Sequence, residues 1–363
     1  MSEGRVSTPK LGGSARPGGA LTRRLRRSLA LHGGLLLVAA TVGYLSLGKP
    51  AAREAASQPE VVIAAGKPTG LTRVELTTPT RSVVLEAQQD AAGRYYTGQL
   101  TRAQQAPPAP DAGAPTLPSP PETQRFVAVT AAEKLAEQLA PLRAYRSLGP
   151  LPDSRLAEFG LDKPEGTLKL TLGGTVHELI LGGTTPGGAD RYVKHAQTGV
   201  GYAIVGSIVR DLEAADARLT ERSLQGFEPE RVTLVRISEG ERQRELVPIQ
   251  GSVGSWADAS EPGRLDETAG NWMLKLGRLR PNSYASEAAP EGSTQVVKVE
   301  YFEGRRSLGD LILVRAPADR VAEGGPEAAK AAYYVRTSHT RWFASVIGAT
   351  GEQVDQDLGS VLR

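Results

Sequence analysis

The chain has 363 residues, 40% of them hydrophobic and 23% charged, so it is long enough for two or three domains with a substantial core. It has no cysteine, which excludes disulfides, thiolate metal sites and cysteine nucleophiles. The pI is near 9.0, yet the first 27 residues carry seven basic residues against Glu3 alone while the whole chain is only +3, so the remainder is mildly acidic and no nucleic-acid partner is expected.

An apolar run follows the basic N-terminal tail, residues 1–28. Residues 29–48 contain no formal charge, and a helix of about 20 residues crosses roughly 30 Å of hydrocarbon. The cluster Arg23, Arg24, Arg26 and Arg27 immediately precedes this run, so the positive-inside rule keeps the tail in the cytoplasm. The sequence therefore predicts a single-pass inner-membrane protein with the bulk of its chain in the periplasm.

A cleaved signal peptide is the alternative for this N-terminus. The apolar run is longer than a usual signal-peptide core and no clean cleavage motif follows it, although residues 49–58 contain four alanines. We expect the helix to be retained as an anchor. Residues 49–69 are then a polar tether to the exported part.

The exported part opens with strand signals and a helix signal. Residues 73–87 form two strand-like runs around a Thr-Pro-Thr turn. Residues 106–121 are rich in proline and predict an insertion without a packed core. Thr130, with Glu133 three residues later, has the pattern of an N-cap, and leucines follow at helical spacing.

Two hairpins and a second helix complete a first module, residues 70–217. Residues 168–181 alternate apolar and polar side chains around Gly173-Gly174, which is typical of a tight hairpin. Residues 191–196 and 201–205 predict the next hairpin, and residues 207–217 the helix.

The same order of signals recurs in residues 227–362, which predicts a second module. Residues 231–234 repeat the pattern of 73–76, and residues 266–280 carry the helix signal. Residues 296–314 repeat the alternating hairpin. The fold class is therefore α+β: one N-terminal transmembrane helix followed by two tandem modules of antiparallel β-hairpins with packed helices.

Two stretches of the first module resemble a known family. They are LAEFGLDKPEGTLKLTL at residues 156–172 and LILGGTTPGGADRYVK at residues 179–194. The chain resembles the bacterial domain-of-unknown-function family 4340 over most of its exported part. It departs from the usual pattern in the proline-rich insertion and in Tyr95-Tyr96, where members often have tryptophan.

The resemblance implies location and partners rather than chemistry. Members look like membrane-anchored envelope proteins that are often encoded beside ABC-type export components of the gliding-motility kind. The family brings no catalytic residues to this chain. Its likeness implies an accessory or scaffold protein whose partners are the inner membrane and membrane transport proteins.

The residues themselves offer no strong catalytic pattern. His177, His195 and His339 lack metal-site spacing, so no metal or cofactor is expected. The glycine-rich loop at residues 182–188 resembles a phosphate-binding loop only in composition, and a hairpin connection is the better interpretation. Paired acids near Gly160 are a pattern found in glycosidases, but solvated charges of a loop are the better interpretation; they are Asp153, Glu158, Asp162 and Glu165.

Large aromatic residues of the second module fit a core. Trp256, Trp272, Trp342 and Phe343 lie on expected helices and strands, with a sugar-stacking or partner-binding face as the alternative. We therefore expect a non-catalytic envelope protein without catalytic, cofactor-binding or metal-binding residues. The alternative is a periplasmic hydrolase or glycan-binding protein.

Overall fold

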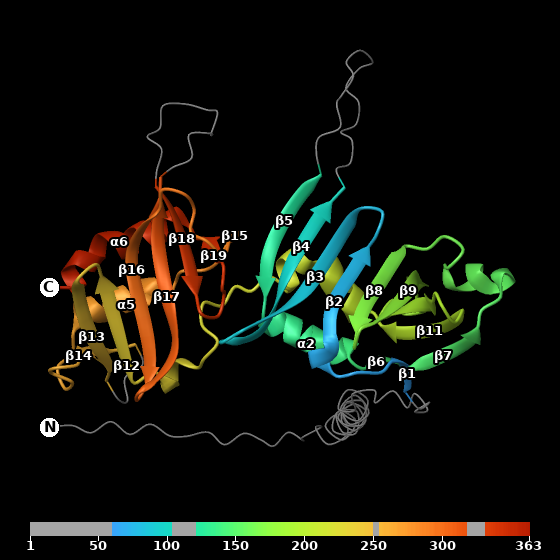
Figure 1. Ribbon diagram of the computed structural model, residues 1–363, viewed down its shortest axis with the longest axis horizontal. Coiled ribbons are helices and arrows are strands. Elements are labelled where there is room, and N and C mark those ends of the chain that lie inside the picture. The colour runs from blue at the N-terminus through green and yellow to red at the C-terminus, as the bar shows by residue number, and fades with distance from the viewer. Residues whose placement is uncertain (1–59, 104–120, 250–253, 318–330) are drawn as a thin grey trace, which may run out of the picture. The chain divides into compact units, whose positions relative to one another are not determined.

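The computed structural model describes residues 60–103, 121–249, 254–317 and 331–363. They belong to one compact unit, Gln58–Arg363, and have an α+β fold with three antiparallel sheets (Figure 1). The predicted anchor, residues 29–48, and nearly all of the proline-rich insertion lie outside the described residues. Within the described ranges no helix is long and apolar enough to cross a membrane.

The first large sheet has nine strands in the order β5-β4-β3-β2-β8-β9-β10-β11-β7. The strands are β2 (Leu71–Thr77), β3 (Arg81–Asp90), β4 (Gly93–Arg102), β5 (Glu122–Ala128), β7 (Arg146–Pro150), β8 (Gly166–Leu172), β9 (Thr175–Thr184), β10 (Asp190–His195) and β11 (Val200–Val205). A separate pair consists of β1 (Val61–Ala64) and β6 (Leu142–Ala144). β1 falls within the range 49–69 predicted as a tether, and its Ala64 is buried because this apolar tetrapeptide pairs with β6.

Helices cover one face of the nine-stranded sheet. They are α2 (Thr130–Leu139), α3 (Ser207–Glu213) and α4 (Ala215–Arg218), with short 3₁₀ turns η1 (Pro68–Gly70) and η2 (Asp153–Phe159). The alternating leucines of β8 are buried beneath them, whereas Lys169 and Glu178 form an ion pair on the polar face. Because one face of the sheet packs against helices and the other is polar, apolar and polar residues alternate along its strands.

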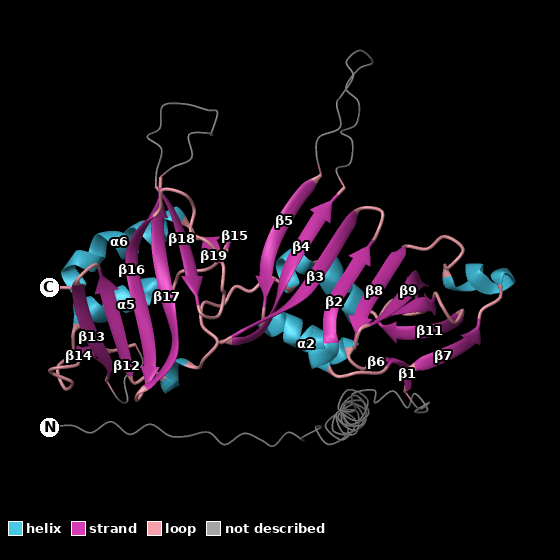
Figure 2. Ribbon diagram, in the orientation of Figure 1, coloured by secondary structure: helices cyan, strands magenta, loops and turns pink. Residues whose placement is uncertain are grey.

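The second large sheet has eight strands in the order β14-β13-β12-β16-β17-β18-β19-β15. They are β12 (Leu234–Glu239), β13 (Arg242–Pro248), β14 (Trp256–Asp258), β15 (Tyr284–Ser286), β16 (Thr294–Glu303), β17 (Arg306–Ala316), β18 (Ala332–Thr337) and β19 (Phe343–Ser345). The 3₁₀ turn η3 (Pro229–Arg231) precedes them, and α5 (Glu267–Leu276) and α6 (Gly348–Val361) pack together on one side of this sheet (Figure 2).

The two large sheets share one strand order. The first sheet is compared from β4 to β7 and the second from β14 to β15. Strands at the same position in the two sheets then also follow one another in the same order along the chain. In both sheets a helix comes before the edge strand at the end of this order: α2 before β7 and α5 before β15. A helix also follows the neighbouring strand: α3 after β11 and α6 after β19. The first sheet differs by the additional edge strand β5.

The observed elements match several sequence predictions and correct others. The hairpins β8–β9 and β16–β17 are confirmed, and Gly173 and Gly174 both have positive φ in the tight turn. Thr130 is wrong as an N-cap: it is the first helical residue, and no side chain of the preceding residue caps α2. The single helix predicted at 207–217 is interrupted at Ala214. Strands β4 and β5 were not predicted.

Candidate functional site

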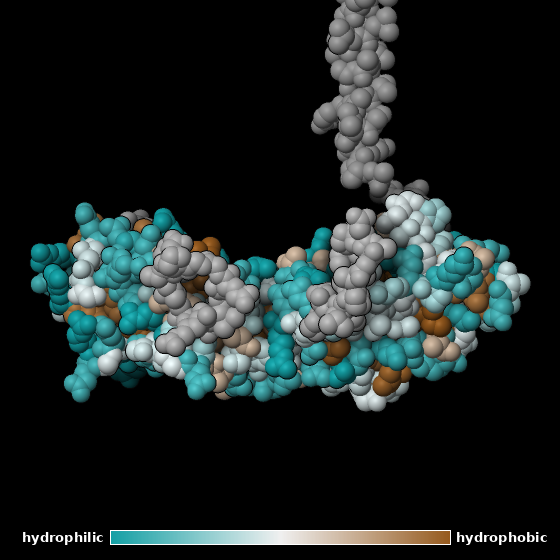
Figure 3. Space-filling view, turned by 90° about the horizontal axis from the view of Figure 1, so that it is seen from above, coloured by the Kyte–Doolittle hydropathy of each residue, from teal (hydrophilic) through white to brown (hydrophobic). Residues whose placement is uncertain are grey.

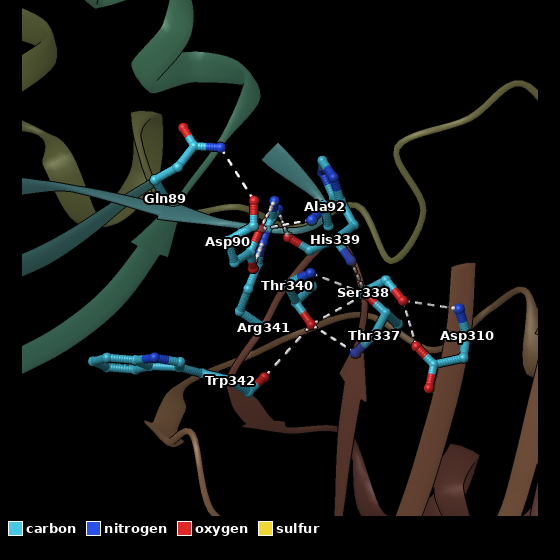
Figure 4. Close-up of polar contacts among 10 residues, drawn as sticks. All are labelled: Gln89, Asp90, Ala92, Asp310, Thr337, Ser338, His339, Thr340, Arg341 and Trp342. Atoms are coloured by element: carbon cyan, nitrogen blue, oxygen red, sulfur yellow. Dashed lines mark hydrogen bonds and ion pairs between the residues drawn. The ribbon is translucent and has the colours of Figure 1, made fainter. Parts of the chain in front are cut away.

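A polar network surrounds the turn between β18 and β19 (Figure 4). Thr337 and Thr340 hydrogen-bond to each other at 3.2 Å between hydroxyls, and both are buried. Ser338 donates to Asp310 of β17 and accepts from the Asp310 amide at 3.0 Å. These bonds fix the turn against its own sheet.

Arg341 projects from this turn toward the hairpin between β3 and β4. Its backbone has φ of 60°, a left-handed conformation that is uncommon for a residue with a side chain. Nε lies 3.1 Å from Asp90 Oδ2, and the guanidinium carbon is 4.8 Å from the centre of the Tyr95 ring. Only 8% of the side chain is exposed. This left-handed turn therefore places the buried guanidinium group of Arg341 against the first sheet.

The Asp90 carboxylate binds both Arg341 and the backbone of its own turn. Its Oδ1 accepts the Ala92 amide at 2.9 Å, which stabilises the hairpin turn. Partial burial raises the pKa of Asp90, but the hydrogen bond and charge of Arg341 outweigh this effect and leave the pKa lowered. The carboxylate is thus ionised and shared between its own turn and Arg341.

A buried carboxylate, Glu221, lies in the segment between α4 and β12. Its Oε2 accepts the Thr130 amide at 3.1 Å, and Oε1 accepts the Ser223 amide at 2.9 Å. His339 Nε2 lies 3.3 Å from Oε2, close enough for an ion pair when protonated, although not aligned for a hydrogen bond. Glu221 therefore supplies the helix cap that the sequence predicted for Thr130 itself.

The ionisation of Glu221 reflects opposing effects. Burial alone raises its pKa, whereas the interaction with His339 and the two backbone amides lowers it, with a net value of about 2. The backbone of the same residue is also bound, because its amide donates to Val127 and its carbonyl accepts the Tyr284 hydroxyl at 2.7 Å. One residue thus joins β5, α2, β15 and the turn after β18.

Two polar hollows adjoin these contacts. One, of about 560 Å³, is lined by Glu122, Thr123, Gln124, Arg125, Asp216, Ala217, Arg222, Asn282, Ser283 and Tyr284. The other, of about 380 Å³, is lined by Arg73, Val84, Glu86, Thr97, Gly98, Gln99, Arg125 and Trp342. Arg125 contributes to both, so the two hollows meet at β5.

The structure brings two of the three predicted histidines together and leaves the third apart. His177 and His195 lie on neighbouring strands with ring centres 5.8 Å apart, whereas His339 lies beside Glu221. Burial, and then the charge of His177, lower the pKa of His195, which favours its neutral form. No group of three or more histidines and acids among the described residues could hold a metal ion.

Two of the four acids near Gly160 form ion pairs with arginines. Glu158 pairs with Arg155 at 2.9 Å, and Glu165 pairs with the buried Arg191. Asp153 begins η2, and Asp162 lies in the exposed loop after it. Residues 182–188 form the end of β9 and the connection to β10, so the hairpin interpretation of this loop is confirmed.

The large aromatic residues are mainly core residues. Trp272 is fully buried and donates to the Val354 carbonyl at 2.9 Å. Phe343 is buried beneath the Arg336 guanidinium, and Trp256 packs against the second core. Trp342 is partly exposed and packs against the first core at the rim of the smaller hollow.

Sequence analysis missed Asp90, Glu221 and Arg341. None belongs to a local motif, and their contacts join residues 91 and 251 positions apart in the chain. The only local signal was the Asp90–Gly93 turn between two polar strands.

The comparisons with known proteins give one match. The model of the family described as "Domain of unknown function (DUF4340)" matches residues 118–295, which span β5 to the start of β16. No curated protein and no solved structure matches the chain. The predicted resemblance to the DUF4340 family is therefore confirmed over residues 118–295, which include Glu221.

Proposed function

We propose that this protein is a membrane-anchored, non-catalytic envelope protein that serves as an accessory or scaffold of an ABC-type transport or gliding-type assembly. In this proposal its periplasmic part consists of two tandem modules, each built from antiparallel hairpins with packed helices. The shared strand order of the two large sheets supports a repeated module. The DUF4340 match supports the comparison with envelope proteins of that family.

The observation that carries the scaffold proposal is the use of buried charges at the contact between the two sheets. The Glu221 carbonyl accepts the hydroxyl of Tyr284 and its carboxylate lies beside His339, both from the second sheet, while Arg341 of the second sheet binds Asp90 and Tyr95 of the first. A catalytic acid or base must be free to exchange a proton with a substrate. These groups are instead occupied in holding one sheet against the other, as a rigid binding platform requires.

A complementation experiment tests this proposal. In a strain that requires the protein, His177→Ala, His195→Ala and Asp162→Asn should each leave the phenotype nearly intact. Removing a catalytic acid or base commonly lowers activity by factors of roughly 100 to 10,000. A null phenotype from any one of them, in a variant that remains folded and membrane-bound, would overturn the scaffold proposal.

The anchor is tested independently by topology. A reporter fused after Arg363 should be active only outside the cytoplasm, because the arginine cluster before residue 29 keeps the N-terminus inside. The protein should remain in the membrane after alkaline extraction. Release of the chain into the soluble fraction would show cleavage of the apolar segment instead.

A glycan-binding function is the second candidate, and one observation favours it. Trp342 borders a hollow that also exposes Thr97 and Gln99, a combination of an aromatic ring and hydrogen-bonding groups that suits a sugar. If this function is correct, Trp342→Ala should abolish binding to purified peptidoglycan in a sedimentation assay. Retained sedimentation of the variant would remove this candidate.

A further inference from the structure

Strand β5 forms one edge of the nine-stranded sheet and pairs along one side with β4. The Val127 carbonyl accepts the Glu221 amide, so the backbone groups of Val127 point away from β4. Backbone direction alternates along a strand, and therefore the amides and carbonyls of Thr123 and Arg125 also point outward. Among the described residues, these outward groups have no backbone partner.

The larger hollow runs along this open edge. Thr123 and Arg125 line one side of it, and the other is lined by Tyr284, the first residue of the edge strand β15, and by Ser283 just before it. Glu221 already adds one backbone hydrogen bond to β5 at the Val127 end, where Tyr284 also binds Glu221. The remaining length of β5 thus borders a polar groove. Over the molecular face drawn in Figure 3 as a whole, hydrophilic residues predominate.

The charges in the groove are not balanced. Its two acids, Glu122 and Asp216, both contact Arg102. Arg222 donates only to backbone carbonyls, those of Pro281 and Asp216, at 3.3 Å each. Arg125 is exposed and has no carboxylate partner among the described residues. Two guanidinium groups therefore remain without a matching anion.

We propose that the open edge of β5 binds an extended acidic segment of a partner protein by β-strand addition. The segment would form backbone hydrogen bonds with Thr123 and Arg125, as in other complexes in which a peptide extends a sheet. Side chains of a strand alternate between two faces, so successive carboxylates reach different arginines. Arg125 and Arg222 both line the groove, and in this proposal each binds carboxylates on one face of the added strand. This inference rests on the scaffold proposal and names the chemistry of its partner.

Selection from a peptide library tests the inference with a defined probe. Random heptapeptides displayed on phage are selected on the full-length protein in detergent micelles, and enriched peptides are synthesised for affinity measurements. We expect aspartate or glutamate at alternating positions. Arg125→Glu should weaken binding at least tenfold, whereas Arg305→Glu, the same charge change in the exposed β16–β17 turn, should leave it unchanged.

Thr123→Pro tests strand addition separately from charge. Proline removes the outward amide of Thr123 but retains the ladder to β4, because the lost donor does not face that strand. We expect at least tenfold weaker binding, with an unchanged circular dichroism spectrum. Hydrogen exchange provides a second measurement: a bound peptide should protect the Thr123 and Arg125 amides.

Three results would overturn the inference: no enriched peptide, equal binding to Arg125→Glu, or binding without protection of the β5 amides. Dimerisation abolished by Thr123→Pro would also overturn it, because the edge would then serve a second copy of this chain. The scaffold proposal is judged by complementation and not by this assay. Failure of peptide binding therefore leaves that proposal to its own test.

Discussion

Glu221 and Arg341 place charge where the two large sheets meet, and each is stabilised differently. Glu221 is 7% exposed and is surrounded by backbone amides, which compensate for the loss of water. Arg341 combines an ion pair with an aromatic contact and a strained backbone. At the residue scale, we therefore expect the two residues to affect stability in different ways: Glu221 through its ionisation, and Arg341 through its backbone conformation.

Glu221 should make stability depend on pH in acid. Its pKa falls from the usual 4.5 to about 2 in the folded protein, so its contribution is complete above about pH 4.5 and is lost as pH falls toward 2. A shift of this size corresponds to about 3 kcal/mol. Glu221→Gln should lower the free energy of unfolding by about that amount at pH 6, with the difference vanishing near pH 2. Urea titrations at several pH values measure it.

Glu137→Gln is the matched control for this pH effect. Glu137 is exposed on α2, so its substitution should leave the acid dependence of the wild-type protein unchanged. Parallel pH profiles for Glu221→Gln and the wild-type protein would contradict the role assigned to Glu221.

The left-handed backbone of Arg341 predicts an unusual ranking of two substitutions. Both Arg341→Gly and Arg341→Ala remove the contacts with Asp90 and Tyr95, but only glycine adopts φ of 60° without a steric cost. The glycine variant should therefore be more stable than the alanine variant by about 1 kcal/mol. Thermal or urea unfolding of the two proteins tests this ranking, and greater stability of the alanine variant would contradict the observed turn.

The residue roles at this contact could not be predicted from the sequence. Local patterns report periods of two or about four residues, whereas Asp90 and Arg341 meet through the arrangement of two sheets. The histidines and the acids near Gly160 attracted attention through residue type alone. The structure places two of these acids, Glu158 and Glu165, in ion pairs with arginines, and it places His339 beside Glu221, a partner that no motif indicated.

At the scale of elements, β8 and β16 occupy corresponding positions in the two sheets. Leu170 and Val299 are fully buried, one in each core. Leu170→Ala and Val299→Ala should each reduce the free energy of unfolding by about 2 to 4 kcal/mol, since both leave a cavity. Lys169→Ala on the polar face of β8 should cost within about 1 kcal/mol. Comparable losses for Lys169→Ala and Leu170→Ala in urea unfolding would contradict the assignment of faces.

The alternation of apolar and polar residues along a strand determines which strands could be predicted from the sequence. The hairpins β8–β9 and β16–β17 have regular apolar positions and glycine turns, so local pattern and burial agree. β4 lacks that pattern because Gly98 leaves space on its core face, and the ring of Phe126 from β5 fills it: a Cβ on Gly98 would lie 2.2 Å from Phe126. The Gly98–Phe126 pair can be recognised only when the register between β4 and β5 is known.

At the scale of the whole described chain, two cores are connected by residues that belong to one sheet and pack into the other. Tyr284 of β15 and Ala344 of β19 are members of the first core cluster, although both strands lie in the second sheet. Tyr284 also hydrogen-bonds to the Glu221 carbonyl. The two sheets should consequently unfold together rather than as independent domains.

Tyr284→Ala should separate the two unfolding transitions. Loss of a buried aromatic side chain costs about 3 to 5 kcal/mol, and here the cost falls on the contact between the cores. Trp342 packs against the first core, so the experiment uses a Trp342→Phe background, in which Trp256 and Trp272 report on the second core by fluorescence while far-ultraviolet circular dichroism reports on both sheets. In urea the two signals should coincide for the full-length Trp342→Phe protein in micelles and diverge when Tyr284→Ala is added. Val176→Ala, at an exposed position of β9, should keep them coincident. Transitions that already diverge in the Trp342→Phe protein would show that the sheets fold independently, and that Tyr284 and Glu221 connect them without coupling their stability.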